Sequence, residues 1–325
     1  GDGIWDKQSG VLRMRQDNEG GIWFTTYSQG VIYLPPDWNR FTSIIKADGT
    51  PLEKLDMRDI TSDGEGGFWV ASIYDLYWLK RGSSTLVHEA DMRDFGADVI
   101  NSIYIRDDGS IWVAYGNGLL LYDPRRNGVR PGPWDGSRPI DASVWYMHEE
   151  PNGTLWLSFA NGRTRRYHPS GEAYPEGDAE KLINSYGVNG AKFSAASDGT
   201  LWYAGADGLY RLRSGRFEPV PGGRIPDISA FRFAGPRQLW LARRGAVETY
   251  RWDGRELALE YSLTHADGLP DVDIGDICIS TKNRGWLATA RGLWLYSPER
   301  DSLRMFGAGS GLPDPNLLLT NLQVG

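Results

Sequence analysis

The sequence of 325 residues has a single cysteine, Cys278, and therefore cannot form an intramolecular disulfide. This cysteine lies in an apolar segment, residues 276–280, where a buried free thiol is expected. Long hydrophobic runs are missing too. No stretch approaches the roughly 18 to 20 apolar residues that a membrane-spanning helix needs, and no signal peptide is recognisable. Because the chain begins with Gly1 and not with methionine, we expect a further segment upstream of it.

The sequence also lacks an excess of positive charge. It has 35 lysines and arginines against 42 aspartates and glutamates, for a formal net charge of −7. A nucleic-acid partner or an anionic membrane surface would require a basic stripe, so neither is expected. Sustained helical periodicity is missing as well, which excludes helical solenoids and doubly wound α/β folds.

Histidine is rare, and the four histidines fall in different parts of the sequence, mostly beside turns: His88, His148, His168 and His265. Metal-dependent hydrolysis requires at least three closely placed ligands, and nucleophilic catalysis requires a base beside the nucleophile. Neither pattern is found. We therefore expect no catalytic residue, no metal and no cofactor in this region.

Tryptophan and glycine, in contrast, are abundant, with 14 and 41 residues. Seven tryptophans recur at intervals of 38 to 46 residues, each opening a hydrophobic run behind a turn: Trp23, Trp69, Trp112, Trp156, Trp202, Trp240 and Trp286. This period is typical of one four-stranded propeller blade. An indole repeated once per blade is expected to pack between neighbouring sheets, so we assign these seven residues to the structural core.

Turn residues divide each unit into short strands. An Asp/Asn/Gly cluster precedes the tryptophan, a second glycine-type turn follows, and a Pro- or Asp-containing turn ends the next strand. Three turns per unit predict an all-β fold, a seven-bladed β-propeller of four-stranded antiparallel blades over residues 1–314. Residues 315–325 are expected to form a terminal strand that closes the ring or leads into a downstream domain, and we favour the second.

The repeated motif resembles a known family. It consists of an Asp or Asn turn, a glycine, an aliphatic–Trp pair, a small-residue strand and Gly-Leu-x-x-Tyr-Asp-Pro, joined by Phe-x-x-x-x-Gly-Leu-Pro linkers. The clearest copies are Asp107 to Pro124 and Thr264 to Pro298. Over nearly the whole chain this pattern resembles the two-component regulator propeller repeat. Two units depart from it: the sixth spans only 38 residues, and the second has Tyr74-Asp75-Leu76 in place of its second turn glycine.

The resemblance implies a non-catalytic, ligand-sensing region of a signal-transduction receptor. Family members are periplasmic or extracellular regions of inner-membrane receptors, namely bacterial hybrid histidine kinases or diguanylate cyclases. Residues 316–322 resemble the strand that leads such propellers into a β-sandwich domain, so the implied partner is a downstream domain of the same receptor. The resemblance also allows a homodimer through the full-length receptor.

Alignment of the units on their tryptophans indicates a binding site at one rim. The position nine residues before each tryptophan is always apolar, whereas the positions ten and eleven residues before it vary widely in chemistry. Innermost strands begin at one rim of a propeller, where binding sites gather. The candidates for binding a small polar or carbohydrate-like ligand are Arg13, Arg58, Asp59, Asn101, Trp145, Tyr146, Lys192 and Asp276. The alternative is that these groups cap strands and line a water-filled channel.

Two other functions stay open at this stage. A propeller enzyme of the lyase type would need a His/Glu or metal cluster at one face. A protein-interaction scaffold would dock a neighbour on its flat face, and Trp134, in the Pro/Gly-rich loop 127–139, is either a surface aromatic for such a contact or a loop anchor.

Overall fold

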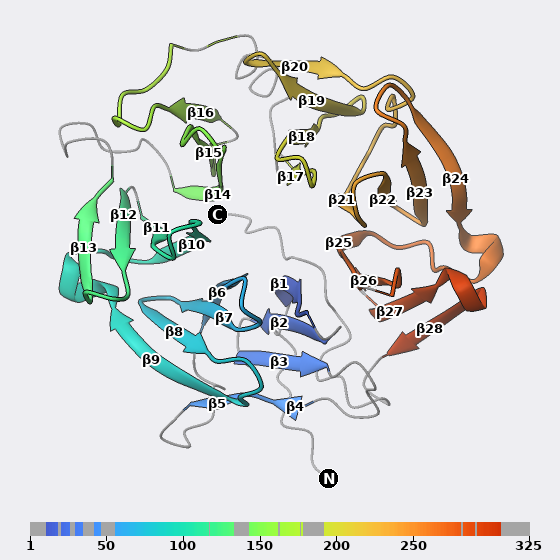
Figure 1. Ribbon diagram of the computed structural model, residues 1–325. Coiled ribbons are helices and arrows are strands. Elements are labelled where there is room, and N and C mark those ends of the chain that lie inside the picture. The colour runs from blue at the N-terminus through green and yellow to red at the C-terminus, as the bar shows by residue number, and fades with distance from the viewer. Residues whose placement is uncertain are drawn as a thin grey trace.

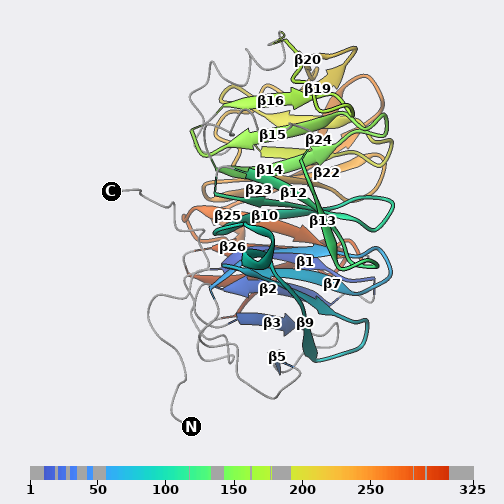
Figure 2. The same cartoon turned by 90° about the vertical axis from the view of Figure 1, so that its left-hand side faces the viewer.

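The computed structural model shows seven antiparallel sheets arranged around a common axis as the blades of a β-propeller (Figure 1). It describes residues 11–18, 21–26, 30–34, 42–46, 56–116, 118–132, 143–161, 163–175, 177, 192–280, 282–289 and 291–306. Seen from the side, the strands run between the two faces of a ring, so the hairpin turns lie on these faces (Figure 2). The predicted all-β, seven-bladed fold is confirmed.

Each blade consists of consecutive strands, with the first innermost and the last on the outside (Figure 1). Blades 1 to 3 contain β1 (Val11–Gln16), β2 (Ile22–Thr26), β3 (Gly30–Leu34), β4 (Thr42–Ser43); β6 (Met57–Ser62), β7 (Phe68–Ser72), β8 (Asp75–Leu79), β9 (Thr85–Asp91); β10 (Ile100–Ile105), β11 (Ile111–Tyr115), β12 (Gly118–Asp123), β13 (Gly128–Pro131).

Blades 4 to 7 contain β14 (Val144–Glu149), β15 (Leu155–Phe159), β16 (Thr164–Tyr167); β17 (Lys192–Ala195), β18 (Leu201–Ala204), β19 (Leu209–Arg213), β20 (Arg216–Pro219); β21 (Ala230–Phe233), β22 (Gln238–Arg243), β23 (Ala246–Trp252), β24 (Leu257–Leu263); β25 (Ile274–Ile279), β26 (Gly285–Thr289), β27 (Gly292–Ser297), β28 (Ser302–Phe306). Short 3₁₀ turns are η2 (Met92–Phe95), η3 (His265–Asp267) and η4 (Pro298–Arg300). No helix within the described ranges is long and apolar enough to cross a membrane.

Two blades differ from the four-stranded prediction. Blade 4 has three strands among the described residues, and a single bridge between Tyr167 and Ala173 follows its third strand. Blade 2 gains a fifth strand, because β5 (Ile45–Lys46), which follows blade 1 in the chain, pairs in parallel with the outer strand β9. The connection between blades 1 and 2 is therefore itself part of a sheet.

The two units that depart from the motif nevertheless form complete blades. Blade 6 has four strands although its tryptophan follows the previous one after only 38 residues. In blade 2 the glycine of the second turn is replaced by side-chain bonding, since the backbone N–H of Asp75 donates to Ser72 Oγ at 3.0 Å. A hydroxyl group thus closes this turn.

The core lies between the blades, where the two faces of each sheet are covered by its neighbours. Strands β2, β7 and β15 are accordingly buried at every position. All seven repeat tryptophans are between 0% and 8% exposed, which confirms the prediction that they form the core. The apolar position nine residues before each tryptophan is also buried in every blade: Met14, Ile60, Ile103, Met147, Phe193, Phe231 and Ile277.

Each repeat tryptophan packs against the next blade in the ring. Trp23 of blade 1 lies among blade 2 residues, with its ring centroid 5.1 Å from that of Phe68. In the same way, Trp286 of blade 7 packs with Met14 and Phe24 of blade 1. This contact closes the ring through side-chain packing. The predicted terminal strand, residues 315–325, lies outside the described residues.

Hydrogen bonds of the indole nitrogens help to fix how neighbouring blades are oriented. Trp112 Nε1 of blade 3 donates to Glu149 Oε2 of blade 4 at 3.1 Å, and Arg106 of blade 3 donates two further bonds to the same carboxylate at 2.8 Å. Close packing also restricts side-chain size: a Cβ atom at Gly285 would lie 2.4 Å from Trp240 Cζ3. Any larger residue at position 285 would push blades 6 and 7 apart.

We predict that Trp156→Ala lowers the free energy of unfolding by about 3 to 5 kcal/mol, the usual loss for a buried large aromatic. Trp156 is 1% exposed, packs with Phe193 and Phe217 of blade 5, and donates to Glu150 Oε1 at 2.7 Å. Trp145→Ala is the control, because Trp145 is 40% exposed. Denaturant unfolding of both variants tests the assignment, and a loss below about 1 kcal/mol for Trp156→Ala would contradict it.

Candidate functional site

The candidate rim is the face of the ring at which the innermost strands begin. In five of the seven innermost strands, the pairing with the second strand shifts by one residue near this start. The residues at the shift are Leu12, Arg58, Asn101, Trp145 and Gly275. A β-bulge re-aims the side chains beside it and bends the strand. The chemically variable sequence positions therefore coincide with a repeated bulge.

Asp59, one of the predicted residues, connects three consecutive blades. Its side chain belongs to blade 2 and is almost fully buried. Asp59 Oδ2 accepts a hydrogen bond from the backbone N–H of Ile103 in blade 3 at 3.0 Å, and Oδ1 lies 3.4 Å from Arg13 Nε in blade 1. The backbone N–H of Ile60 donates to Oδ1 at 2.9 Å. Both carboxylate oxygens are thus engaged within the protein.

Asp276 of blade 7, which is separated from blade 2 only by blade 1, shows part of the same arrangement. Its Oδ1 accepts from the backbone N–H of Ile277 at 2.8 Å and from Arg232 Nη2 of blade 6 at 3.0 Å. Arg58 is paired locally, since its Nη2 donates to Asp56 Oδ2 at 2.9 Å, while its buried Nε has no hydrogen-bond partner. The charged rim residues therefore form ion pairs between and within blades.

The remaining predicted residues lie on blades 3 to 5. Asn101 Nδ2 donates to the carbonyl oxygen of Gly116 at 3.4 Å. Tyr146 stacks on Phe193 of blade 5, with ring centroids 5.1 Å apart, and its neighbour Trp145 is one of the few large apolar side chains that the described structure leaves exposed. Lys192 begins β17 opposite Ala204, and its side chain lies outside the described parts.

Sequence reasoning missed the position eight residues before each tryptophan. In five blades this position carries Arg15, Tyr104, His148, Arg232 and Cys278. Because side chains alternate along a strand, it lies on the same face as the predicted position two residues earlier. The alternation of side chains along a strand was the sequence signal that could have identified these five residues.

Several of these side chains lie close enough to influence one another's charge state although their blades are spread around the ring. Burial raises the pKa of Tyr146 in blade 4, and the charges of Arg232 in blade 6 and Arg15 in blade 1 act in the opposite direction. Burial also raises the pKa of the Cys278 thiol in blade 7 to about 12, with the same two arginines nearby. Side chains from four blades therefore approach one another around the axis.

The raised pKa of Cys278 determines how reactive its thiol is at this rim. Cys278 is a free cysteine packed against the core between blades 7 and 1, and with its raised pKa it stays a neutral thiol at physiological pH. A neutral thiol is a weak nucleophile. Within the described ranges, no group of three or more His, Cys, Asp or Glu side chains is placed to hold a metal ion.

His148 is the least exposed of the five side chains found eight residues before a repeat tryptophan. It is 8% exposed, its Nε2 has no hydrogen-bond partner, and its ring meets the Tyr104 ring edge-to-face at 6.3 Å. Burial lowers the pKa of His148 to about 4. The imidazole is therefore neutral at pH 7.

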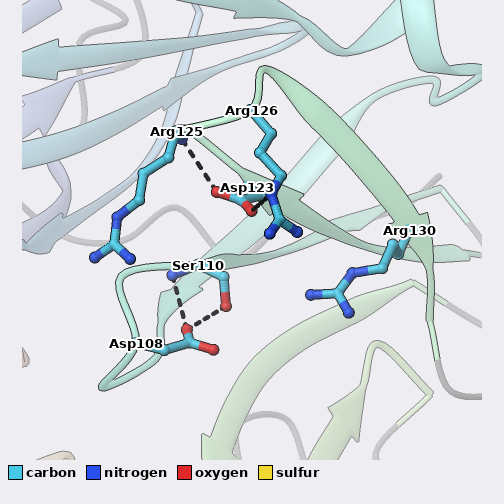
Figure 3. A pocket seen from close by; sticks show the side chains of 6 residues that line it. All are labelled: Asp108, Ser110, Asp123, Arg125, Arg126 and Arg130. Atoms are coloured by element: carbon cyan, nitrogen blue, oxygen red, sulfur yellow. Dashed lines mark hydrogen bonds and ion pairs between the residues drawn. The ribbon is translucent and has the colours of Figure 1, made fainter.

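A shallow depression lies elsewhere, on blade 3, with a volume of about 230 Å³. Its lining residues come from two neighbouring hairpin turns and the outer strand: Asp108, Ser110, Asp123, Arg125, Arg126 and Arg130 (Figure 3). The turns between first and second strands and between third and fourth strands lie on the face opposite the candidate rim. The depression is therefore separate from the predicted binding residues.

Comparison with known proteins shows the fold. No family model matches the chain, and no curated protein does. YCF48 from Cyanidioschyzon merolae is similar in structure with a TM-score of 0.58 at 10% identity, over 89% of this chain and 95% of that one. The WD40 β-propeller domain of Doa1 gives the same TM-score and identity, over 89% and 92% of the two chains.

A third similar structure is the extracellular domain described as that of the one component system BT4673 from B. thetaiotaomicron. It matches at 16% identity with a TM-score of 0.49, over 94% of this chain and 53% of that one. The chain thus spans about half the length of that domain. At these identities the likeness shows the propeller fold alone, and membership of the two-component regulator family stays a prediction.

We predict that His148 makes stability fall with acidity. Its pKa is lower in the folded protein than the ordinary 6.5, so the folded state binds fewer protons than the unfolded chain. The stabilisation is complete above pH 6.5 and is lost as the pH falls towards 4. The pKa difference corresponds to about 3 kcal/mol.

Denaturant unfolding at pH 7 and pH 4 of the wild type and of His148→Gln, which cannot titrate there, measures this loss. The wild type should lose about 2 to 3 kcal/mol more than the variant over this interval. Equal losses in both proteins would show that His148 does not titrate as described.

Proposed function

We propose that this chain is a non-catalytic, ligand-sensing propeller that binds a small polar or carbohydrate-like molecule at the rim where the innermost strands begin. The observation that carries the proposal is the repeated bulge, which in five blades falls on the positions with the most varied side chains. A purely structural position repeated around a ring would instead favour one class of side chain, as the buried position nine residues before each tryptophan does with Met, Ile and Phe.

Trp145 gives this rim an aromatic surface. It occupies the bulge of β14 and is 40% exposed, although a large indole gains much free energy from burial. An exposed ring beside polar side chains offers a flat contact for the apolar face of a sugar. Asn101 at the bulge of the adjacent inner strand β10 adds an amide for directional hydrogen bonds.

The candidate residues divide into two roles. The carboxylates of Asp59 and Asp276 are engaged with backbone N–H groups and arginines, so they support the rim and hold the arginines in place. Trp145, Asn101 and Lys192 are the residues we assign to direct ligand contact. Binding would then depend on several blades at once.

The cellular context of the proposal comes from the sequence motifs. They support a periplasmic or extracellular region of a bacterial receptor, with a downstream domain of the same receptor as partner. Ligand occupancy of the rim would be passed to that domain through the ring. The proposal rests on these motifs and on the rim geometry, and the structural likeness to other propellers adds only the fold.

The lyase alternative has no observation in its favour. The histidines make separate contacts: His88 Nε2 lies 2.9 Å from Asp75 Oδ1, His168 Nδ1 lies 3.0 Å from Ser170 Oγ, and His265 Nδ1 lies 3.2 Å from the carbonyl oxygen of Leu269. These groups belong to blades 2, 4 and 6–7. They do not converge on one site.

We predict that Trp145→Ala and Lys192→Ala each weaken ligand binding at least about tenfold, a change of about 1.4 kcal/mol. A panel of neutral and charged mono- and oligosaccharides is first screened by thermal shift, and the best binder is titrated calorimetrically. Leu259→Ala is the control, because Leu259 is 55% exposed on the outer strand β24. Unchanged affinity in both rim variants would place the ligand elsewhere.

A second expectation concerns catalysis. The isolated chain should show no turnover of cyclic ester or glycoside substrates by mass spectrometry, because its histidines do not converge and its cysteine has a raised pKa. Product formation that depends on any one histidine, or a stoichiometric metal detected by elemental analysis, would overturn the non-catalytic proposal.

A further inference from the structure

The depression on blade 3 lies between two hairpin turns on the face away from the candidate rim. One turn joins β10 to β11 and contributes Asp108 and Ser110, and the other joins β12 to β13 and contributes Asp123, Arg125 and Arg126. Arg130 of β13 completes the lining (Figure 3). With a volume of about 230 Å³, the depression has room for a small anionic group.

The two aspartates are occupied by the turns themselves. Asp108 Oδ1 accepts from the backbone N–H of Ser110 at 2.9 Å, and Oδ2 accepts from Arg106 Nη1 at 3.0 Å. Asp123 Oδ1 accepts from the backbone N–H of Arg125 at 3.1 Å. These carboxylates fix the turn backbones, and their charge is directed at the turns.

The arginines, in contrast, keep most of their hydrogen-bonding capacity. Within the described part of the chain, the guanidinium groups of Arg125 and Arg130 form no hydrogen bond or ion pair. Arg126 is 81% exposed and makes only a long contact, 3.7 Å from its Nε to Asp123 Oδ2. Three arginines and two aspartates therefore line one depression, in a protein whose net charge is −7.

The backbone that carries these arginines is held in place. Asn127 adopts a left-handed conformation with φ of 44°, and its Oδ1 accepts a hydrogen bond from the buried Tyr122 hydroxyl at 3.1 Å. The backbone N–H of Arg126 donates to the carbonyl oxygen of Asp123 at 3.2 Å. A fixed turn reduces the ordering cost of binding.

In blade 7 the corresponding place is filled by side chains of opposite charge that pair with each other. Its corresponding turn, 297–301, has the same backbone form, with Asp301 at φ of 45°. Where blade 3 has Arg125, blade 7 has Glu299, which accepts from Arg284 Nε of the neighbouring turn at 2.9 Å. Blade 7 thus closes the gap with an ion pair. In blade 3 the charge of Arg125 acts on the nearby Asp108, but within the described residues the two side chains form no ion pair or hydrogen bond.

We propose that the blade 3 depression binds a tetrahedral oxyanion, the phosphate or sulfate group of a small ligand. Guanidinium groups bind such oxygens through paired, charge-assisted hydrogen bonds, and Arg125, Arg126 and Arg130 all line this depression. Ser110 also lines the depression, and its hydroxyl donates to Asp108 Oδ1. This site is independent of the rim and of its ligand.

The experiment is calorimetric titration of the protein at low ionic strength with sodium phosphate and, separately, sodium sulfate. Glycerol 3-phosphate and methyl sulfate distinguish a phosphate ester from a sulfate ester, and sodium acetate tests a carboxylate. We expect saturable binding with a Kd on the order of millimolar for phosphate or sulfate, weakened by added sodium chloride. The double variant R125A/R130A should bind at least about tenfold more weakly.

Two further variants sharpen the test. R125E copies the charge found in blade 7 and should abolish binding, whereas R300A removes an exposed arginine from the corresponding blade 7 turn and should leave it unchanged. All three variants should keep the wild-type melting temperature within about 2 °C, since the altered side chains are on the surface. The proposal is overturned by no saturable binding of phosphate or sulfate, by acetate binding equally tightly, or by equal weakening in R300A.

Discussion

The apolar surface that no single blade can cover by itself is the constraint on which the rest of the structure depends. Strands such as β2, β7 and β15 are buried at every position, so an isolated blade would expose both of its faces to water. Stability then comes from interfaces between blades, and the repeat tryptophans supply the largest contacts there. Since Trp286 packs on Met14 and Phe24, the first and last blades depend on each other although they are far apart in sequence.

Buried carboxylates give these interfaces their register. Asp59 accepts hydrogen bonds from blades 2 and 3 and faces an arginine of blade 1, and Glu149 accepts from Arg106 and Trp112 of the preceding blade. Apolar packing alone would allow neighbouring sheets to slide, whereas a carboxylate with two fixed donors does not. Asp59 also faces Arg13 at the candidate rim, so the support of the ring and the preparation of the candidate site share this residue.

The sequence predicted what depends on period and burial. The spacing of the tryptophans identified seven blades. The apolar position nine residues before each tryptophan, which includes Met14 and Phe231, identified the buried side of the innermost strands. It could not predict features that depend on register or on contacts between distant turns. Examples are the bulges at Arg58 and Trp145 and the parallel pairing of Ile45 with Thr85. A further example is the proximity of Arg15 and Arg232 to Tyr146, because these residues come from three different blades. For the candidate site, the residue types and the rim were predictable, but the ion pairs that occupy Asp59 and Asp276 were not.

The parallel strand β5 has a consequence for association between molecules. A propeller has no free strand at its centre, but the outermost strand of every blade presents unpaired N–H and C=O groups to which another chain can add. On β9, the seven-residue outer strand of blade 2, the preceding linker occupies part of this edge through Ile45 and Lys46. Other outer strands are short and end in proline, as β13 and β20 do at Pro131 and Pro219, or carry charge, as β24 does at Glu260. The chain thereby protects its perimeter against edge-to-edge aggregation, and shortening the linker at β5 would expose the edge of β9 at Thr85 and Leu86 as well.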